Sequence, residues 1–486
     1  MSKFNQKTEG KNKTTNRNGW EAYAMEIKEH LVTVVLTSMI NEHKYYGSTD
    51  DELFELVDKL IKDEPDFIAK LACYARNEGN LRSVSHVLAA IIAHDAKDYT
   101  KQVIDKVVVR PDDILEIMSC YKNLYGKPFP NALKRAIAKQ MNRFNEYNIA
   151  KYKSTNKGFN FKDVLRICHP VPINEEKQII FNHIINDTLE TPYTWETELS
   201  AKGNNKEVWN ELIASDKLGY MAKLRNLRNM FRVEADVEKV LKSISERDAV
   251  KNSKQFPFRF YSAYRELACS NRDWANKARP YIDKCLEYSV ANLPVLNGRT
   301  LIAVDISGSM SMTISDRSAV TCADIAKVFA CLSNKICEDA TVVYFSSSYF
   351  NHSGITVKKY GKYDSALKTI ESAPSVSGGT EMSLPILWAL NDDTSDKPFD
   401  RIIYFSDNEC NSGRKTVQSW VNKYKNKFNC DPWVHAVDLC GYGTQQFFGK
   451  KFNLIAGWSD AVIPFIHIAE NGIGNLVSVI ENYSLS

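Results

Sequence analysis

The sequence predicts an array of short helices over residues 20–295, followed by a doubly wound α/β domain over residues 296–486. Apolar residues recur at helical spacing through the first part without a clean repeat period, which is typical of an α-solenoid. The segment LPVLNGRT, which begins at Leu293, carries proline and glycine and marks the boundary. After it, short apolar strands alternate with helical tracts, as in a parallel sheet covered by helices on both faces.

Each helix is predicted from an amphipathic stretch with suitable end signals. Pro65, for example, lies near the start of one stretch and Gly79 follows its end. The predicted helices are 49–63, 64–80, 81–94, 131–147, 174–189, 206–215, 235–245 and 259–269, and the predicted strands are 301–307, 340–347, 401–408 and 433–439. A chain of 486 residues is too long for one core, in agreement with two parts.

Composition excludes several classes of protein. The chain has ordinary globular values of 44% hydrophobic and 25% charged residues. No apolar run reaches the ~20 residues that span a bilayer, so no membrane partner is expected. Residues 1–19 are polar and basic, which predicts a disordered arm. The 11 cysteines form no CxxC pair, which argues against a disulfide framework and a zinc site and fits a cytoplasmic location.

Charge is distributed unevenly along the chain. From Leu301 to Ser486 there are 16 Lys and Arg against 19 Asp and Glu, a net charge of −3, so the total of +4 leaves +7 for residues 1–300. The excess concentrates between Tyr121 and Lys157, where nine Lys and Arg accompany a single acid, Glu146. Such a tract predicts an anionic partner.

Oxygen-bearing side chains follow the strands of the predicted α/β domain. At the carboxyl edge of a parallel sheet these side chains can converge on one point. The predicted metal ligands are Asp305, Ser307 and Ser309 in DISGS, Thr380 in SGGTEMS and Asp407 in FSDNE. Carboxylate and hydroxyl oxygens are hard ligands that suit Mg²⁺, with Mn²⁺ as the alternative. DISGS alone is only a modest signal, because a serine-rich helix cap in which Asp305 satisfies backbone donors is the alternative.

The order DxSxS, Thr, Asp resembles the metal-ion-dependent adhesion site of von Willebrand factor A domains. That resemblance implies that the ion binds an acidic group of a partner without turning over a substrate.

The basic tract contains a predicted helix, 131–147, with Asn131 as its N-cap and a buried stripe on one face. On another face the cations recur every four residues. This row and its extension comprise Arg135, Lys139, Arg143, Lys151, Lys153 and Lys157. Rows of this kind are commonly solvated faces, but solvated faces normally mix both signs of charge. The tract therefore favours contact with phosphates.

Several segments of the chain resemble the Ro autoantigen, or TROVE-domain, family, in particular bacterial or phage-type Ro ribonucleoproteins. The resemblance rests on FPNALKRA, AKYK, FKDVLRICHP, MAKLRNLRNM and FPFRFYSAYREL, followed by DISGSM, GGTEMSLPILWA and FSDNE. It covers most of the chain from about Trp20. It implies a ring of HEAT-like helical repeats, closed by the A domain, that binds small noncoding Y RNAs on its outer surface and single-stranded ends of misfolded RNA in its hole.

The resemblance also implies particular RNA-binding residues. Lys151 in AKYK and His169 in RICHP match positions of the family's Y RNA site, and Lys157 matches a further basic position only through a gap. Arg166 is also a predicted RNA-binding residue, because it lies one helical turn before His169 and is its neighbour on the helix surface. Arg82 and His86 are also one turn apart, and the sequence leaves open whether they line the hole or pack.

Three functional hypotheses follow. The leading one is a non-enzymatic, monomeric RNA-binding protein of RNA quality control or RNA processing, with an exoribonuclease or other acidic protein as partner of the metal site. The second is a protein-interaction module that uses the metal site. The third is a metal-dependent RNA hydrolase. It is disfavoured because the predicted ion site lacks the carboxylate cluster of two-metal nucleases. A closed ring further requires the Trp20–His30 segment to meet the α/β domain.

Overall fold

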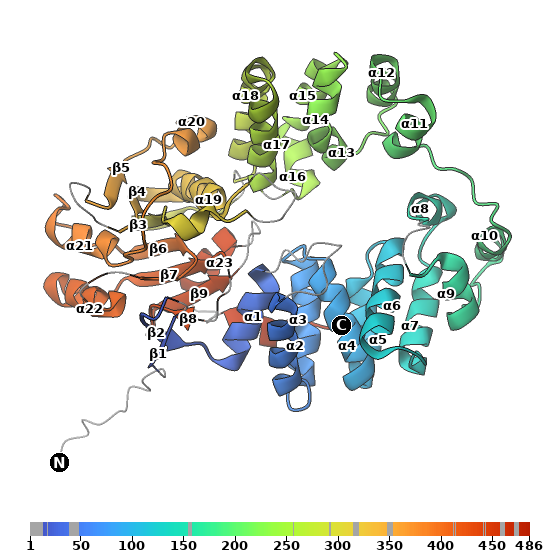
Figure 1. Ribbon diagram of the computed structural model, residues 1–486, viewed down its shortest axis with the longest axis horizontal. Helices are drawn as coiled ribbons and strands as arrows, with labels where there is room; N and C mark the ends of the chain where they lie inside the picture. The colour runs from blue at the N-terminus through green and yellow to red at the C-terminus, as the bar shows by residue number, and fades with distance from the viewer. Residues whose placement is uncertain are drawn as a thin grey trace. The chain divides into compact units, whose positions relative to one another are not determined.

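The computed structural model describes residues 13–16, 18–37, 48–153, 158–255, 257–290, 293–313, 320–347, 353–411, 413, 415–440, 442, 444–456, 462–470 and 476–486. The chain divides into two compact units (Figure 1). Residues Met1–Ser38 and Gly219–Leu476 form one unit, and residues Met39–Leu218 and Val477–Ser486 form the other. The division between these units does not fall at residue 295. The domain boundary at residue 295 therefore stays a prediction.

The unit of residues 39–218 and 477–486 consists of helices in its described part. They are α2 (Ser48–Leu60), α3 (Pro65–Asn77), α4 (Ser83–Asp95), α5 (Thr100–Val107), α6 (Pro111–Tyr125), α7 (Asn131–Met141), α8 (Glu146–Lys151), α9 (Phe161–Cys168), α10 (Glu175–Asn186), α11 (Trp195–Lys202), α12 (Lys206–Ala214) and most of α24 (Leu476–Glu481), with a 3-10 turn at Lys97–Tyr99. Neighbouring helices such as α3 and α4, α4 and α6, and α5 and α7 pack on each other, so their apolar stripes become buried. The predicted helical array is confirmed.

The predicted helix 131–147 is interrupted. Helix α7 ends at Met141, and Asn145 caps α8 by accepting a hydrogen bond from the Asn148 backbone at 2.8 Å. An asparagine side chain that bonds the backbone locally competes with helix continuation. Asn131 is the first residue of α7 rather than its cap, which is Pro130, so that prediction is wrong.

The other unit contains a six-stranded sheet in the order β5-β4-β3-β6-β7-β9. The strands are β3 (Leu296–Asp305), β4 (Cys337–Phe345), β5 (Ile355–Lys358), β6 (Arg401–Ser406), β7 (Trp433–Asp438) and β9 (Phe452–Ala456). All neighbours are parallel except β4 and β5. Helices α21 (Leu384–Asn391) and α22 (Val417–Phe428) share a core with alternate sheet residues such as Leu301 and Ala303. Helix α19 (Cys322–Ile336) stacks Phe329 on Phe405, which completes a doubly wound domain, as predicted.

The same unit holds further helices, namely α1 (Ile27–Thr37), α13 (Tyr220–Arg225), α14 (Leu227–Arg232), α15 (Val237–Ile244), α16 (Arg247–Ser253), α17 (Pro257–Ser270), α18 (Arg272–Tyr288), α20 (Ala366–Glu371) and α23 (Val462–Ile468). Ion pairs join α17 and α18 to the α/β domain. Arg265 bonds Asp324 at 3.1 Å, and Arg279 bonds Glu371 at 2.5 Å. Helices on both sides of residue 295 therefore belong to one compact body.

The N-terminal segment also joins this unit. Strand β1 (Lys13–Thr15) pairs with β2 (Glu21–Ala24), and β2 pairs with β8 (Thr444–Gln445) of the α/β domain. The prediction of disorder is wrong for Lys13–Thr15, because backbone pairing orders a polar segment that has no apolar pattern of its own. Residues 1–12 lie outside the described residues. The expected meeting of Trp20–His30 with the α/β domain is confirmed, while closure of a ring stays a prediction.

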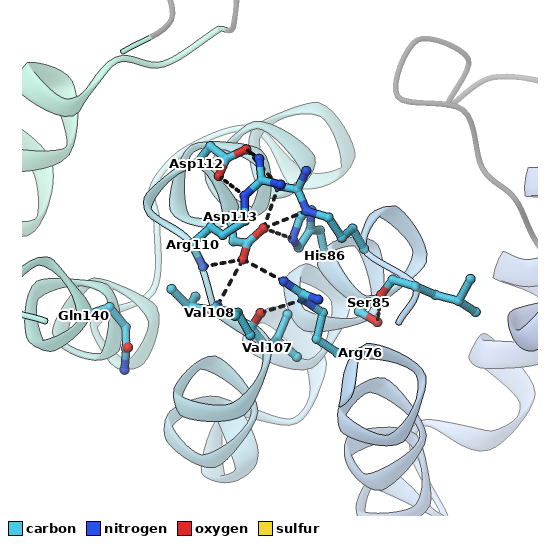
Figure 2. Close-up of polar contacts among 12 residues, drawn as sticks. Arg76, Ser85, His86, Val107, Val108, Arg110, Asp112, Asp113 and Gln140 are labelled. Atoms are coloured by element: carbon cyan, nitrogen blue, oxygen red, sulfur yellow. Dashed lines mark hydrogen bonds and ion pairs between the residues drawn. The ribbon is translucent and has the colours of Figure 1, made fainter. Parts of the chain in front are cut away.

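A buried polar network centred on Asp113 fixes helices α3, α4 and α6 (Figure 2). The carboxylate accepts hydrogen bonds from Arg76 Nη2 at 3.2 Å, Arg82 Nη2 at 2.6 Å, His86 Nε2 at 3.0 Å and the backbone nitrogens of Val109 and Arg110 at 3.0 and 2.8 Å. Arg82 and His86, whose role the sequence left open, thus have a packing role. None of the described helices is both long and apolar enough to cross a membrane.

Candidate ion site and candidate RNA interface

The two predicted metal-binding carboxylates lie side by side at one edge of the sheet. Asp305 is the last residue of β3, and Asp407 directly follows β6. These strands are parallel neighbours, with Val304 opposite Phe405, so both carboxylates emerge at the carboxyl end of the sheet. Both are almost fully buried, with exposed fractions of 0% and 1%.

Two loops bring the predicted hydroxyl ligands to this edge. The backbone nitrogen of Gly308 donates to the carbonyl of Gly378 at 2.8 Å, which fastens the DISGS loop to the SGGT loop. The hydroxyls of Ser307 and Ser309 lie 3.2 Å apart. Thr380 is 1% exposed, two residues beyond this link. The loops that carry the predicted hydroxyl ligands therefore meet at the carboxyl end of the sheet.

Each carboxylate has one oxygen held by a backbone amide. Asp305 Oδ1 accepts from the Ser307 nitrogen at 2.8 Å, and its Oδ2 accepts from Ser406 Oγ at 2.6 Å. Asp407 Oδ1 accepts from the Glu409 nitrogen at 3.1 Å. Asp407 Oδ2 is buried and has no hydrogen-bond partner among the described residues. A buried, unpaired carboxylate oxygen is costly unless a cation or water satisfies it.

The electrostatics also fit a cation. Burial, followed by repulsion from Asp407, raises the pKa of Asp305 to about 7. Burial likewise raises the pKa of Asp407 above its ordinary value. Two buried carboxylates that repel each other are stabilised by a positive charge placed between them. Within the described part of the chain, no group of three or more His, Cys, Asp or Glu side chains is arranged to hold a metal, so any ion here depends on hydroxyl ligands.

The sequence analysis missed two supporting residues. Ser406 donates to Asp305, as described above, and Asn411 fixes the threonine loop from both sides. Asn411 Oδ1 accepts from the Thr380 nitrogen at 2.7 Å, and the Asn411 nitrogen donates to the Thr380 carbonyl at 3.0 Å. A Cβ atom on Gly379 would lie 2.6 Å from Asn411 Oδ1, which explains the glycine. The only sequence signal for both residues is their polarity beside Asp407.

In the helical unit, α9 presents two of the predicted RNA-binding residues. A capping box of Asn160 and Asp163 begins this helix, and His169 ends it in the left-handed conformation at φ 47°. Arg166 and His169 are both exposed. Within the described part of the chain, neither side chain makes a hydrogen bond or an ion pair. Both are therefore available to a ligand.

The lysines at the end of α8 and just after it have different surroundings. Lys151 Nζ lies 5.9 and 5.8 Å from the ring centres of Tyr147 and Tyr152. Lys153 Nζ lies 3.5 Å from Asp187 Oδ1, and that carboxylate also pairs with Lys162 at 3.4 Å. Lys157 lies outside the described residues.

The predicted row of cations on α7 is only partly free. Lys139 Nζ pairs with Asp105 Oδ2 at 2.8 Å, and Arg143, which lies beyond the end of α7, donates to the Val108 carbonyl at 3.0 Å. Arg135 donates to the Asn131 carbonyl of its own helix at 3.3 Å. The local sequence contains almost no acids, but the fold brings Asp105 of α5 next to these cations.

These basic residues lie on or beside the helices α7, α8 and α9, and we call them the basic strip, which comprises Arg135, Lys139, Arg143, Lys151, Lys153, Arg166 and His169. Asn142 Nδ2 donates to the Val171 carbonyl at 3.0 Å, and so joins the end of α7 to the loop after His169. Asp187 joins Lys153 to α9 through Lys162. Helices α7 and α9 also pack on each other. The strip can present several cations to one extended anion.

Family comparisons match both parts of the chain. The TROVE domain matches residues 25–191 and 187–306, which is more than half of the chain, and the Ro60 vWA domain matches residues 299–447.

Individual relatives are distant. The chain is 24% identical over 347 residues to telomerase protein component 1 of Rattus norvegicus, which covers 53% of this chain and 13% of that protein. It is 25% identical over 259 residues to RNA-binding protein RO60 of Deinococcus radiodurans, covering 48% of this chain and 45% of the relative. The chain thus spans less than half the length of either relative. The crystal structure of the Deinococcus radiodurans RO (RSR) protein superposes with a TM-score of 0.64 at 18% identity, over 91% of this chain and 99% of that one, which shows a shared fold.

Proposed function

This chain belongs to the TROVE-domain family of Ro proteins, with a von Willebrand factor A domain of the Ro60 type, and we propose that it binds structured RNA through the basic strip. The observation that carries the proposal is the exposure of Arg166 and His169 on α9 without an intramolecular partner in the described part of the chain. An unpaired cation such as Arg166 can release counterions from RNA directly, whereas a paired cation must first break a bond. The similarity to RNA-binding protein RO60 of Deinococcus radiodurans supports RNA as the ligand.

The salt dependence of RNA binding tests this proposal. For wild-type protein, the logarithm of the affinity is expected to fall linearly with the logarithm of the salt concentration. Arg166→Ala should reduce the slope by about 0.7 to 0.9, the value of one phosphate contact. Lys139→Ala should change it less, because Asp105 already neutralises Lys139. Filter binding at several salt concentrations measures both slopes.

Lys139→Ala is the matched control, since it removes one cation from the same strip. Slopes that change equally in both variants would show that intramolecular pairing does not limit phosphate contact. Unchanged slopes in both would place the RNA elsewhere.

The finer function is also a proposal. The RNA is a Y-type small noncoding RNA, single-stranded ends of misfolded RNA are a second ligand, and the protein acts in RNA quality control or processing by binding rather than catalysis. Binding rather than catalysis is supported by the ligand set at the carboxyl end of the sheet, which offers two carboxylates and several hydroxyls, whereas a two-metal nuclease needs a larger carboxylate cluster and the described residues contain none. RNA that is cleaved by the pure protein with Mg²⁺ would contradict this part.

We further propose that Asp305, Ser307, Ser309, Thr380 and Asp407 hold one Mg²⁺ or Mn²⁺. The buried Asp407 Oδ2, without a hydrogen-bond partner in the described part of the chain, supports a cation there. A bound ion would supply a coordination position for an acidic group of a protein partner, such as an exoribonuclease. That use is the second candidate function, and it does not require RNA.

Asp305→Asn is expected to lower the affinity for Mn²⁺ at least about tenfold, because it removes a charged ligand and about 1.4 kcal/mol or more of binding free energy. RNA affinity should stay nearly unchanged, since the basic strip lies in the other compact unit. Calorimetric titration with Mn²⁺ and filter binding with RNA measure the two effects. A tenfold loss of RNA affinity in the folded variant would show that the sites are coupled.

A further inference from the structure

The N-terminal hairpin β1–β2 contacts the loop that carries Asp407. Asn16, between the two strands, is only 5% exposed, which is uncommon for an asparagine. Its Nδ2 donates to the carbonyl of Cys410, while its Oδ1 accepts from the backbone nitrogens of Asn18 and Trp20 at 3.1 and 3.0 Å. Asn16 thus shapes the hairpin with one atom and holds the loop with another.

A second link lies beside it. Asn18 Nδ2 is 3.4 Å from Glu409 Oε2, and the other oxygen of Glu409 accepts from the Thr444 hydroxyl at 3.3 Å. Thr444 is in β8, the strand that pairs with β2. The hairpin and β8 therefore hold residues 409 and 410 from two directions.

The held loop reaches the candidate ion ligands at both of its ends. At one end the Asn408 nitrogen donates to Ser406 Oγ at 3.0 Å, and that hydroxyl donates to Asp305 at 2.6 Å. At the other end Asn411 bonds both the nitrogen and the carbonyl of Thr380. Asn408 itself adopts a left-handed conformation at φ 59°. A non-glycine residue keeps this conformation when its surroundings fix it.

We infer that Asn16 is a positioning residue of the ion site, which it orders by fastening the loop of Asp407 to the N-terminal hairpin. This inference rests on the ion site proposed above. Asn16 touches no ligand atom, so its contribution is to the geometry of Asp407 and Thr380 and not to coordination. The N-terminal hairpin, far from Asp407 in sequence, thereby sets the affinity of the sheet edge for a divalent cation.

Titration of the full chain with Mn²⁺ alone tests the inference. Asn16→Ala should weaken Mn²⁺ binding about tenfold, the lower end of the effect of losing a residue that orients a metal ligand. Lys13→Ala is the matched control on the same hairpin, since Lys13 is 70% exposed and pairs only with Glu21, at 2.7 Å, among its described contacts. Its affinity should equal that of the wild type.

Unchanged affinity in Asn16→Ala would overturn the inference, and so would an equal loss in Lys13→Ala, which would show that any damage to the hairpin acts alike. If Asn16→Ala does not fold, Asn18→Ala tests the same inference. This variant keeps the hydrogen bonds of the Asn16 side chain and removes only the contact of the Asn18 side chain with Glu409. A loss of up to about tenfold supports the inference, and wild-type affinity overturns it. Absence of Mn²⁺ binding by the wild type would instead refute the ion site itself.

Discussion

Asp113→Ala is expected to lower the free energy of unfolding of the helical unit by about 3 to 5 kcal/mol. Asp113 is 0% exposed, and Arg76 and His86 beside it are 8% and 1% exposed. Removing the carboxylate leaves a buried guanidinium without its counter-charge and two backbone nitrogens without their acceptor. Helices α3, α4 and α6 lose their common anchor at the same time.

The acid sensitivity of this unit follows from the same residue. Burial alone would raise the pKa of Asp113, but the hydrogen bond from His86 and the charges of Arg82 and Arg76 hold it well below the ordinary value of 3.8. A depressed pKa stabilises the folded state fully above the ordinary value, and this contribution is lost as the pH falls toward the folded pKa. The stabilisation should therefore be complete at neutral pH and decline only below about pH 4.

Urea unfolding, together with hydrogen exchange of the amides of α3, α4 and α6, measures the effect. Asp66→Ala is the matched control, because Asp66 lies in α3 and pairs with Lys70 at 2.6 Å but is half exposed. It should cost less than about 1 kcal/mol. Equal losses in the two variants would show that burial of the Asp113 network does not determine stability.

Replacing Lys151, Arg166 and His169 together by alanine is expected to weaken RNA binding about 100-fold, or about 2.8 kcal/mol. The two cations contribute through phosphates and so to any RNA, whereas an imidazole can hydrogen-bond a base or ribose. His169→Ala alone should therefore weaken binding to the cognate RNA more than to an unrelated hairpin. Lys151→Ala alone should weaken both.

Filter binding with both RNAs, after circular dichroism has shown that the variants fold, measures these losses. The control is Lys59→Ala with Lys62→Ala, which removes two exposed cations from the end of α2 and its following turn. It lowers the net charge as much as losing Lys151 and Arg166 does. A comparable loss in the control would mean that overall charge, and not the basic strip, determines affinity.

Local patterns in the sequence predicted the secondary-structure elements and the residues of the proposed ion site. Helices such as α3 follow from an apolar period and an initial proline, which involve neighbours within a few residues. Asp305 and Asp407 were identifiable because both follow apolar strands, and the carboxyl ends of parallel strands share an edge. The end of α7 was missed because the side chain of Asn145 competes locally with the apolar period.

Only the tertiary structure decided which charges are paired. Lys139 looks free in the sequence, yet Asp105 neutralises it from α5, and Arg82 and His86 are occupied by Asp113 from α6. The order in the N-terminal hairpin likewise comes from β8, more than four hundred residues away. Such pairings depend on which faces of distant elements meet in the fold. Sequence periodicity records that a residue is buried or exposed, but not which partner it meets.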